Sequence, residues 1–355
     1  QAVDTVNMAH LGARAFEEIG GEVVQTTSFV MRKSHVKGYK GTYCRLIEPT
    51  TQWGKEDMFL ARENHYVAQQ DNFSKIPGAP VAYWVSNHTF DLFSKEKVGD
   101  FFRARVGLIT TDNDLFLRFF WEVDYRNIFF SAHDDNEALL SRKKWFPHNK
   151  GGSFRKWAGN REYVVDWENR GQRIKKSAVQ KYPYLKGNPN FVVHDDGYYF
   201  HENVSWSEIT SGRLAFRYFP CGFTFNVKGM SAFCNSNHSL FWLLGFSNST
   251  VVNYFARIIN PSLSFGVNSF NAIPFIETSK QVEKLSIENI QISTADWDSF
   301  ETSWDFTRHP LVRGVSTVAE AFAAWESECN ARFTQLKANE EELNRIFIDI
   351  YGLQD

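Results

Sequence analysis

Residues 144–160 gather side chains that are able to bind a nucleic acid. The pair Gly151-Gly152 lets a backbone come close to a ligand or adopt a positive φ angle. Around this pair, arginine can hold guanine, asparagine can read an adenine edge, and tryptophan can stack on a base. The alternative is a basic hairpin with Trp145 and Trp157 in the core. The candidate DNA-contacting residues of this segment and its border are Asn149, Lys150, Arg155, Lys156, Trp157, Asn160 and Arg161.

Two further segments, residues 170–186 and 211–218, are rich in basic side chains. The first forms either a loop that follows DNA phosphates or a solvated basic loop. In the second, strand alternation places two arginines on one face, where they either hold DNA or pair with acids such as Glu202 and Glu208. The candidate DNA-contacting residues of these segments are Lys175, Lys176, Arg213 and Arg217.

The net charge of −2 hides a separation of charge along the chain. Residues 141–190 contain thirteen lysines and arginines against three acids, whereas residues 277–355 contain fifteen acids against seven bases. A basic middle followed by an acidic end suggests that the middle binds a polyanion.

Catalytic signatures are absent from the sequence. No Asp/Asn-Pro-Pro-Tyr/Phe tetrapeptide occurs, and residues 187–190 and 260–262, which come nearest, lack the second proline and the aromatic residue. No glycine-rich nucleotide loop follows a predicted strand. A cluster of two histidines and two acids reads as a polar turn rather than a metal site, because its spacing matches no known site type. The cluster is His194, Asp195, Asp196 and His201.

Length and composition set the broad class. A chain of 355 residues exceeds the usual size of one domain, and its 33 Phe, 13 Tyr and 11 Trp can fill a sizeable core. The most apolar stretch, residues 240–246, is far shorter than the roughly 20 residues of a membrane-spanning helix, and no signal peptide opens the chain. The four separated cysteines fit a reducing cytoplasm. Because residue 1 is Gln rather than Met, we expect a fragment of a longer protein.

The order of expected elements predicts an α+β protein. Residues 1–50 resemble the end of an α/β domain, in which two strands form an antiparallel pair at a sheet edge, and residues 51–85 read as a connector. The elements expected here are a helix at 13–19, strands at 22–32 and 41–47, and a helix within 55–70.

Residues 86–292 contain many short aromatic or β-branched runs between turns, which is typical of a twisted, mostly antiparallel sheet. Strands are expected at 116–123, 163–167, 191–193, 214–219 and 222–227, and helices at 239–244 and 250–259. Residues 293–355 are expected to be mainly helical, with one helix beginning near Ser316 or Thr317. Asn339 is expected to cap a second helix, because three acids follow it in the first turn.

Long strings of the chain resemble the PglX family, the adenine-specific DNA methyltransferases of BREX phage-defence systems. Residues 240–276 are also similar, more loosely, to the target-recognition domains of type I and type IIG restriction enzymes. The strings that carry the first resemblance are residues 14–32, residues 145–152 (Trp-Phe-Pro-His-Asn-Lys-Gly-Gly), residues 154–159, residues 163–169 and residues 296–310.

The resemblance implies a domain order. It consists of the C-terminal end of a methyltransferase domain at 1–50, a connector at 51–85, a target-recognition (DNA-binding) domain at 86–292 and a C-terminal helical spacer at 293–355. In the family's order the Asn-Pro-Pro-Tyr motif and the S-adenosylmethionine loop precede Gln1. We therefore expect this chain to hold no cofactor and no catalytic residue, and to be inactive alone.

The intact enzyme would transfer a methyl group from S-adenosylmethionine to N6 of an adenine that is flipped out of the helix. Its implied partners are double-stranded DNA and other BREX defence proteins, without a membrane. Substitution of Arg155 or Lys156 by alanine should then weaken DNA binding. Two alternatives remain, namely a stand-alone DNA specificity subunit and a protein-interaction scaffold that uses the acidic tail.

Overall fold

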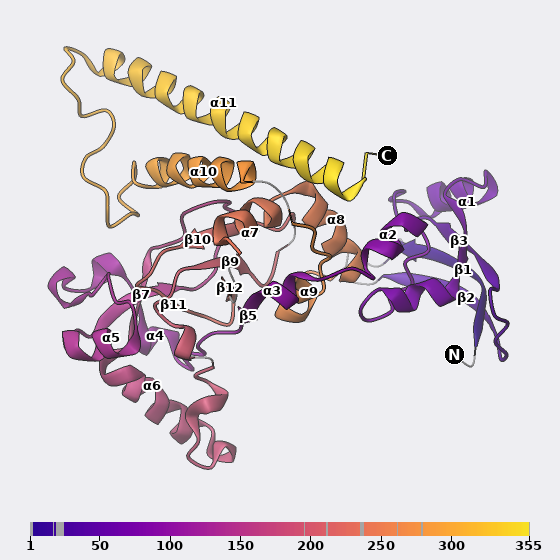
Figure 1. Cartoon of the computed structure of the whole chain (residues 1–355), viewed down its shortest axis with the longest axis horizontal. Coiled ribbons are helices and arrows are strands. Elements are labelled where there is room, and N and C mark those ends of the chain that lie inside the picture. The colour runs from indigo at the N-terminus through magenta and orange to yellow at the C-terminus, as the bar shows by residue number, and fades with distance from the viewer. Residues whose placement is uncertain are drawn as a thin grey trace. The chain divides into compact units, whose positions relative to one another are not determined.

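The computed structural model describes residues 3–16, 18, 25–194, 196–210, 212–234, 238–260, 262–277 and 280–354. The chain folds into two compact units, residues 1–95 and residues 96–355, and it is of the mixed α+β class that the sequence predicts. Figure 1 shows strands and helices in both units, with the long helix α11 at the C-terminal end. No helix among the described residues is both long and apolar enough to cross a membrane.

The first unit contains a four-stranded sheet in the order β2-β1-β3-β4. Strand β1 pairs antiparallel with β2 and parallel with β3, and β3 pairs antiparallel with β4. Helices α1 and α2 begin at serine or threonine caps, and the 3-10 helix η1 follows β4. The bounds are β1 Asp4–Gly12, β2 Thr26–Arg32, β3 Lys40–Arg45, α1 Gln52–Leu60, β4 His65–Gln69, η1 Gln70–Lys75 and α2 Asn87–Leu92.

Two expectations for this unit are wrong, and a third is confirmed only in part. The two predicted strands exist as β2 and β3, but they do not pair with each other, because β1 lies between them. The sequence of β1 mixes Asp4, Asn7 and His10 with apolar residues, so it lacks the alternation that indicates a strand. The described residues of 13–19 form turns rather than a helix, and the expected helix within 55–70 ends at Leu60.

Lys55 fixes α1 to the sheet of the first unit. Its side chain is buried, and Nζ donates to the carbonyl oxygens of Leu11 and Leu46, each at 2.7 Å. Burial lowers the pKa of this ammonium group. A lysine in a sequence read as polar connector therefore serves as an internal cross-link between the strands and the helix.

The second unit contains two four-stranded sheets, in the orders β10-β9-β12-β5 and β11-β7-β8-β6. All strand pairs are antiparallel except β11 with β7. The mostly antiparallel architecture predicted for this part is therefore confirmed. The bounds are β5 Phe102–Arg105, β6 Leu117–Phe119, β7 Trp145–Asn149, β8 Tyr163–Asp166, β9 Asn203–Ser207, β10 Phe216–Phe219, β11 Thr224–Phe225 and β12 Gly229–Cys234.

Helices flank these sheets and form the C-terminal end of the unit. Their bounds are α3 Val98–Phe101, α4 Asn113–Phe116, α5 Asp135–Ser141, α6 Glu168–Lys181, α7 Leu240–Ser247, α8 Thr250–Ile259, α9 Val267–Asn271, α10 Gln281–Trp297 and α11 Val318–Tyr351. The 3-10 helices are η2 Phe120–Glu122, η3 Tyr125–Asn127, η4 Pro183–Leu185, η5 Pro189–Phe191 and η6 Asp196–Tyr198. Residues 169–171 have positive φ angles and break the helical path at the start of α6. Figure 1 places α6 at the opposite end of this unit from α10 and α11.

Several local expectations for this unit are wrong. Residue 191 ends the 3-10 helix η5 and residues 192–193 follow it, so no strand forms there, and residues 170–186 are largely helix α6 rather than a loop. Asn339 does not begin a second helix, because α11 is continuous. Its buried side chain instead donates to Oδ1 of Asn289 in α10 at 2.9 Å, and Figure 1 shows the two helices alongside each other.

Candidate nucleic-acid interface

The glycine pair lies in a loop, residues 149–161, that leaves strand β7 and is fixed by Asn149. This asparagine is 1% exposed, and its Oδ1 accepts the Gly151 amide at 3.0 Å. Its Nδ2 donates to Ser205 Oγ at 2.5 Å and to the Gly229 carbonyl at 3.2 Å. Gly151 has a φ of +82°, and a Cβ there would lie 2.6 Å from the Lys228 carbonyl oxygen. Only glycine fits this position without displacing β12 and its neighbours.

The second half of the 149–161 loop is held against strand β10. Trp157 donates its amide to the Phe216 carbonyl and accepts the Tyr218 amide, both at 2.8 Å. Trp157 and Asn160 have positive φ angles of 70° and 55°, which cost energy for residues other than glycine. Asn160 is buried and donates to the Ser153 carbonyl at 3.0 Å. The loop is therefore a defined turn supported at both ends.

Arg217, in strand β10, holds the loop by a hydrogen bond to its backbone. It is 1% exposed and donates to the Arg155 carbonyl and to Ser207 Oγ, each at 3.1 Å. Burial lowers its pKa to about 10, so the guanidinium remains charged at neutral pH. Arg213 is exposed and precedes β10, which begins at Phe216. The expectation that Arg213 and Arg217 share one strand face is therefore wrong.

A groove of about 490 Å³, here called the Arg213 groove, lies between the 149–161 loop and residues 207–215. Its rim carries exposed apolar side chains, with Phe154 61%, Ile209 58% and Leu263 63% exposed. Its polar lining includes Ser207, Thr210, Arg213 and Arg217. The groove offers one exposed cation, apolar contact area and backbone amides, which are the groups that read base edges.

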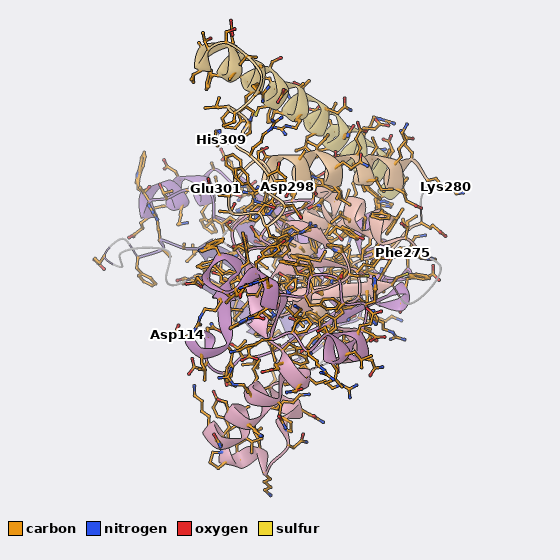
Figure 2. The ribbon with its side chains drawn as sticks, turned by 90° about the vertical axis from the view of Figure 1, so that its left-hand side faces the viewer. Asp114, Phe275, Lys280, Asp298, Glu301 and His309 are labelled. Carbon is orange, nitrogen blue, oxygen red and sulfur yellow. The ribbon has the colours of Figure 1, made fainter. Side chains whose placement is uncertain are left out.

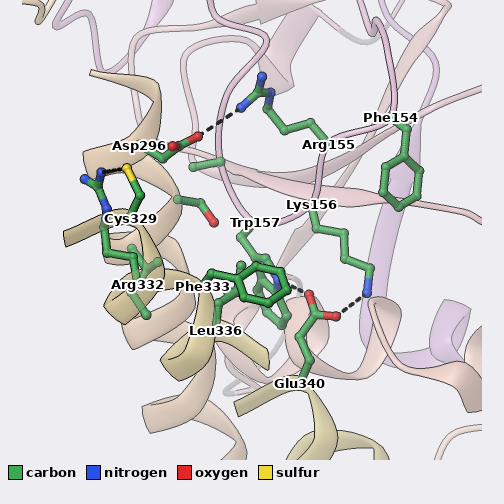
Figure 3. A pocket seen from close by; sticks show the side chains of 13 residues that line it. Phe154, Arg155, Lys156, Trp157, Asp296, Cys329, Arg332, Phe333, Leu336 and Glu340 are labelled. Carbon is green, nitrogen blue, oxygen red and sulfur yellow. Dashed lines mark hydrogen bonds and ion pairs between the residues drawn. The ribbon is translucent and has the colours of Figure 1, made fainter. Parts of the chain in front are cut away.

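Three of the predicted residues turn away from this groove toward the C-terminal helices. Lys156 Nζ lies 2.7 Å from Glu340 Oε2, and Trp157 Nε1 donates to Glu340 Oε1 at 2.7 Å. Arg155 Nη1 lies 3.7 Å from Asp296 Oδ2. Figure 3 shows these contacts around a second pocket, of about 470 Å³, between the loop and helices α10 and α11.

The remaining predicted residues are spread over the unit. Lys150 is partly exposed and packs 4.6 Å from the Tyr163 ring centroid, and Arg161 donates to the Tyr218 carbonyl at 2.8 Å. On α6, Lys175 Nζ lies 5.4 Å from the centroid of the Trp167 ring, and the next residue, Lys176, is exposed. The structure therefore brings the residues of 149–161, 213 and 217 together and leaves the α6 lysines apart from them.

Two acidic residues follow α10, which Figure 1 places at the opposite end of the unit from α6. Figure 2 shows Asp298 and Glu301 just past the end of α10, beneath α11, with Lys280 at the beginning of α10. Part of the basic region meets these acidic helices directly, because Arg155 and Lys156 pair with Asp296 and Glu340. The exposed lysines of α6 lie at the other end of the unit.

Sequence reasoning missed Phe154, Ile209 and Leu263, because single exposed apolar residues have no signature beyond their position in a loop. His148 is fully buried and bonds Thr224 Oγ1 at 2.8 Å, and burial lowers its pKa to about 3. Among the described residues no group of three His, Cys, Asp or Glu side chains could hold a metal ion. Asp195 of the predicted polar turn lies outside the described residues.

Comparison with known proteins identifies relatives along the whole chain. It is 42% identical over 367 residues to the adenine-specific methyltransferase PglX of Lacticaseibacillus casei (strain Zhang), which covers 99% of this chain. It is 35% identical over 354 residues to the adenine-specific methyltransferase BrxX of Escherichia coli O9:H4 (strain HS), which covers 98% of it. The chain spans 30% and 28% of the length of these curated relatives. No protein-family model matches it.

Among solved structures, the type IIL restriction-modification enzyme MmeI, determined in complex with DNA, aligns with 100% of this chain and 44% of its own at a TM-score of 0.56 and 10% identity. The type IIG restriction endonuclease BpuSI aligns with 98% of this chain and 44% of its own at a TM-score of 0.35 and 10% identity. The likeness to MmeI is one of fold. By sequence, the chain belongs over its full length to the same family as a segment of the PglX and BrxX adenine-specific methyltransferases.

Proposed function

We propose that this chain recognises the DNA sequence at which a BREX adenine-specific methyltransferase acts. The observation that carries the proposal is the Arg213 groove, which lies beside a glycine turn fixed by buried side chains. The homology with PglX and BrxX supports the methyltransferase context, and the fold shared with MmeI supports a DNA-binding architecture.

In this proposal the exposed residues contact DNA and the buried ones hold the surface in shape. Arg213 can donate two hydrogen bonds to guanine, while Phe154, Ile209 and Leu263 contact apolar base edges such as the thymine methyl. Exposed lysines such as Lys176 bind phosphates and set affinity without reading sequence. Asn149, Asn160 and Arg217, all buried, position the loop.

The intact enzyme would use S-adenosylmethionine held outside this chain and would methylate N6 of a flipped adenine. This chain would supply the orientation of the duplex and the choice of site, and no reacting group. The methyl mark would distinguish host DNA from phage DNA, and other BREX proteins would be partners of the intact enzyme.

The decisive experiment compares Arg213→Gln with Arg257→Gln. Arg257 is an exposed arginine in the last turn of α8, outside the Arg213 groove, so its loss is a matched change of charge. Binding of the intact protein to a selected duplex and to a scrambled duplex is measured across a salt series. We expect Arg213→Gln to cost about 1–3 kcal/mol on the selected duplex only, because a bidentate base contact is lost.

If Arg213→Gln binds the selected duplex as tightly as Arg257→Gln does, the groove does not read bases. If the unsubstituted protein already binds both duplexes equally, the recognition function itself is wrong.

A further inference from the structure

Glu340 of helix α11 joins two neighbouring residues of the 149–161 loop. We infer that Glu340 is a positioning residue that sets the shape of this loop and thereby the sequence discrimination of the Arg213 groove. The inference rests on the proposed function, because it concerns how the same groove is held.

The contact is made by one carboxylate with two donors of different kinds. Oε2 pairs with the Lys156 ammonium group and Oε1 accepts from the Trp157 indole, both at 2.7 Å. The Lys156 and Glu340 side chains are 19% and 27% exposed, so water screens this pair less than a pair on the open surface. The carboxylate therefore fixes the direction of two successive side chains at once.

The backbone at this point needs such support. Trp157 has a positive φ of 70°, and Gly159, two residues later, has a φ of 113°. A conformation of this kind persists in a residue other than glycine only when its surroundings determine it. For Trp157 those surroundings are the hydrogen bonds to β10 and the bond from its indole to Glu340.

Helix α11 is itself anchored on both sides of Glu340. The preceding residue, Asn339, bonds Asn289 of α10, and Leu343 and Phe347 are buried one and two turns later. Near the end of the helix, the Tyr351 hydroxyl donates to the Pro274 carbonyl at 2.8 Å. The carboxylate is thus presented to the loop from a fixed helix.

A shift at Lys156 would reach the groove through the short path to Phe154. Phe154 lines both the Arg213 groove and the pocket between the loop and the helices. Arg155 lies between Phe154 and Lys156 in the chain, and its carbonyl accepts a hydrogen bond from Arg217. Release of Lys156 and Trp157 would therefore let the apolar rim move relative to Arg213.

The competing interpretation is that Lys156 leaves Glu340 and binds a DNA phosphate. The two interpretations predict different salt dependence of DNA binding. Loss of a phosphate contact lowers the slope of log affinity against log salt concentration by about one unit, whereas loss of a positioning contact leaves this slope unchanged.

The test uses Glu340→Gln and, as its control, Glu341→Gln in the intact protein. Glu341 is the next residue of the same helix, is 68% exposed and pairs only loosely with Lys337, at 3.8 Å. Thermal unfolding confirms that both variants are folded. Affinity is then measured on the selected and the scrambled duplex at several salt concentrations.

We expect Glu340→Gln to reduce the ratio of the two affinities about five- to tenfold, with the salt slope unchanged, and Glu341→Gln to change neither. If Glu340→Gln and Glu341→Gln have the same ratio of affinities for the selected and the scrambled duplex, the inference is overturned while the recognition function stands. Lack of discrimination by the unsubstituted protein overturns both.

Lys156→Gln gives a second, independent readout. A positioning role predicts the same loss of discrimination as in Glu340→Gln, no further loss when both substitutions are combined, and an unchanged salt slope. A slope lower by about one unit, with additive effects, would assign Lys156 to a phosphate and refute the role of Glu340.

Discussion

Replacement of Asn149 by alanine tests whether the 149–161 loop is held from beneath. The change removes the acceptor of the Gly151 amide and the donor to Ser205 Oγ and to the Gly229 carbonyl. Ser205 keeps its hydrogen bond to the Met230 carbonyl at 2.8 Å, so its hydroxyl is not stranded. One net hydrogen bond contributes about 1 kcal/mol, and a buried group left without its partner costs about 1–3 kcal/mol. The expected loss is therefore roughly 2–4 kcal/mol.

Urea denaturation measures this loss, and hydrogen exchange of peptides that cover residues 149–161 locates it. Exchange at the Gly151 amide should rise even under conditions in which the protein remains folded, because that amide loses its acceptor. Asn330→Ala is the control, since Asn330 is exposed on α11 and far from the loop in sequence. DNA discrimination should fall together with loop protection.

A loss below about 1 kcal/mol with unchanged exchange would refute the view that the asparagine organises the turn. Loss of stability with full DNA discrimination would instead separate the turn from the reading of bases.

Two further outcomes follow from buried positions near the loop. Gly151→Ala should destabilise the protein by about 1–3 kcal/mol in thermal or urea unfolding, because the new Cβ would lie 2.6 Å from a carbonyl oxygen at a positive φ; a neutral result would mean that β12 can yield. His148, whose pKa burial lowers to about 3, should make stability depend on pH. Below about pH 6.5 the unfolded chain binds a proton that the native histidine does not, so the full stability present above that pH is lost progressively as the pH falls toward 3. His148→Asn should flatten this dependence in urea titrations from pH 7 to pH 4, and an unchanged slope would assign it to other groups.

The sequence predicted elements well where local signals agree. Helix α8 has the predicted bounds, 250–259, because Ser249 caps it. Helix α11 begins after Thr317, where a capping box with Glu320 marks the start. The sequence prediction failed at Asn339, where a cap residue followed by acids lies inside a helix. Asn339 bonds Asn289 of α10, and the next residue, Glu340, bonds a loop nearly two hundred residues earlier. Local signals cannot report such partners.

The candidate site shows the same division. The residue types of the 149–161 loop indicated a special turn, and the structure places its glycines and asparagines in one. Whether a basic residue there is exposed and without an acidic partner could not be read from the sequence. Arg217 and Lys156 have the same charge pattern as exposed contacts, yet one is buried and the other pairs with Glu340. Only the three-dimensional neighbours of each cation decide between support and exposure.

The division between a buried frame and an exposed rim has a consequence for how such a module can change. Asn149, Gly151 and Asn160 each satisfy a backbone requirement, so their replacement damages the turn. Phe154, Ile209 and Leu263 are more than half exposed, and surface substitutions of this kind usually alter stability by no more than about 0.5 kcal/mol. New side chains at the rim can therefore be sampled one at a time while the scaffold stays intact. If the groove reads DNA as proposed, such a surface would acquire a new target sequence through single substitutions.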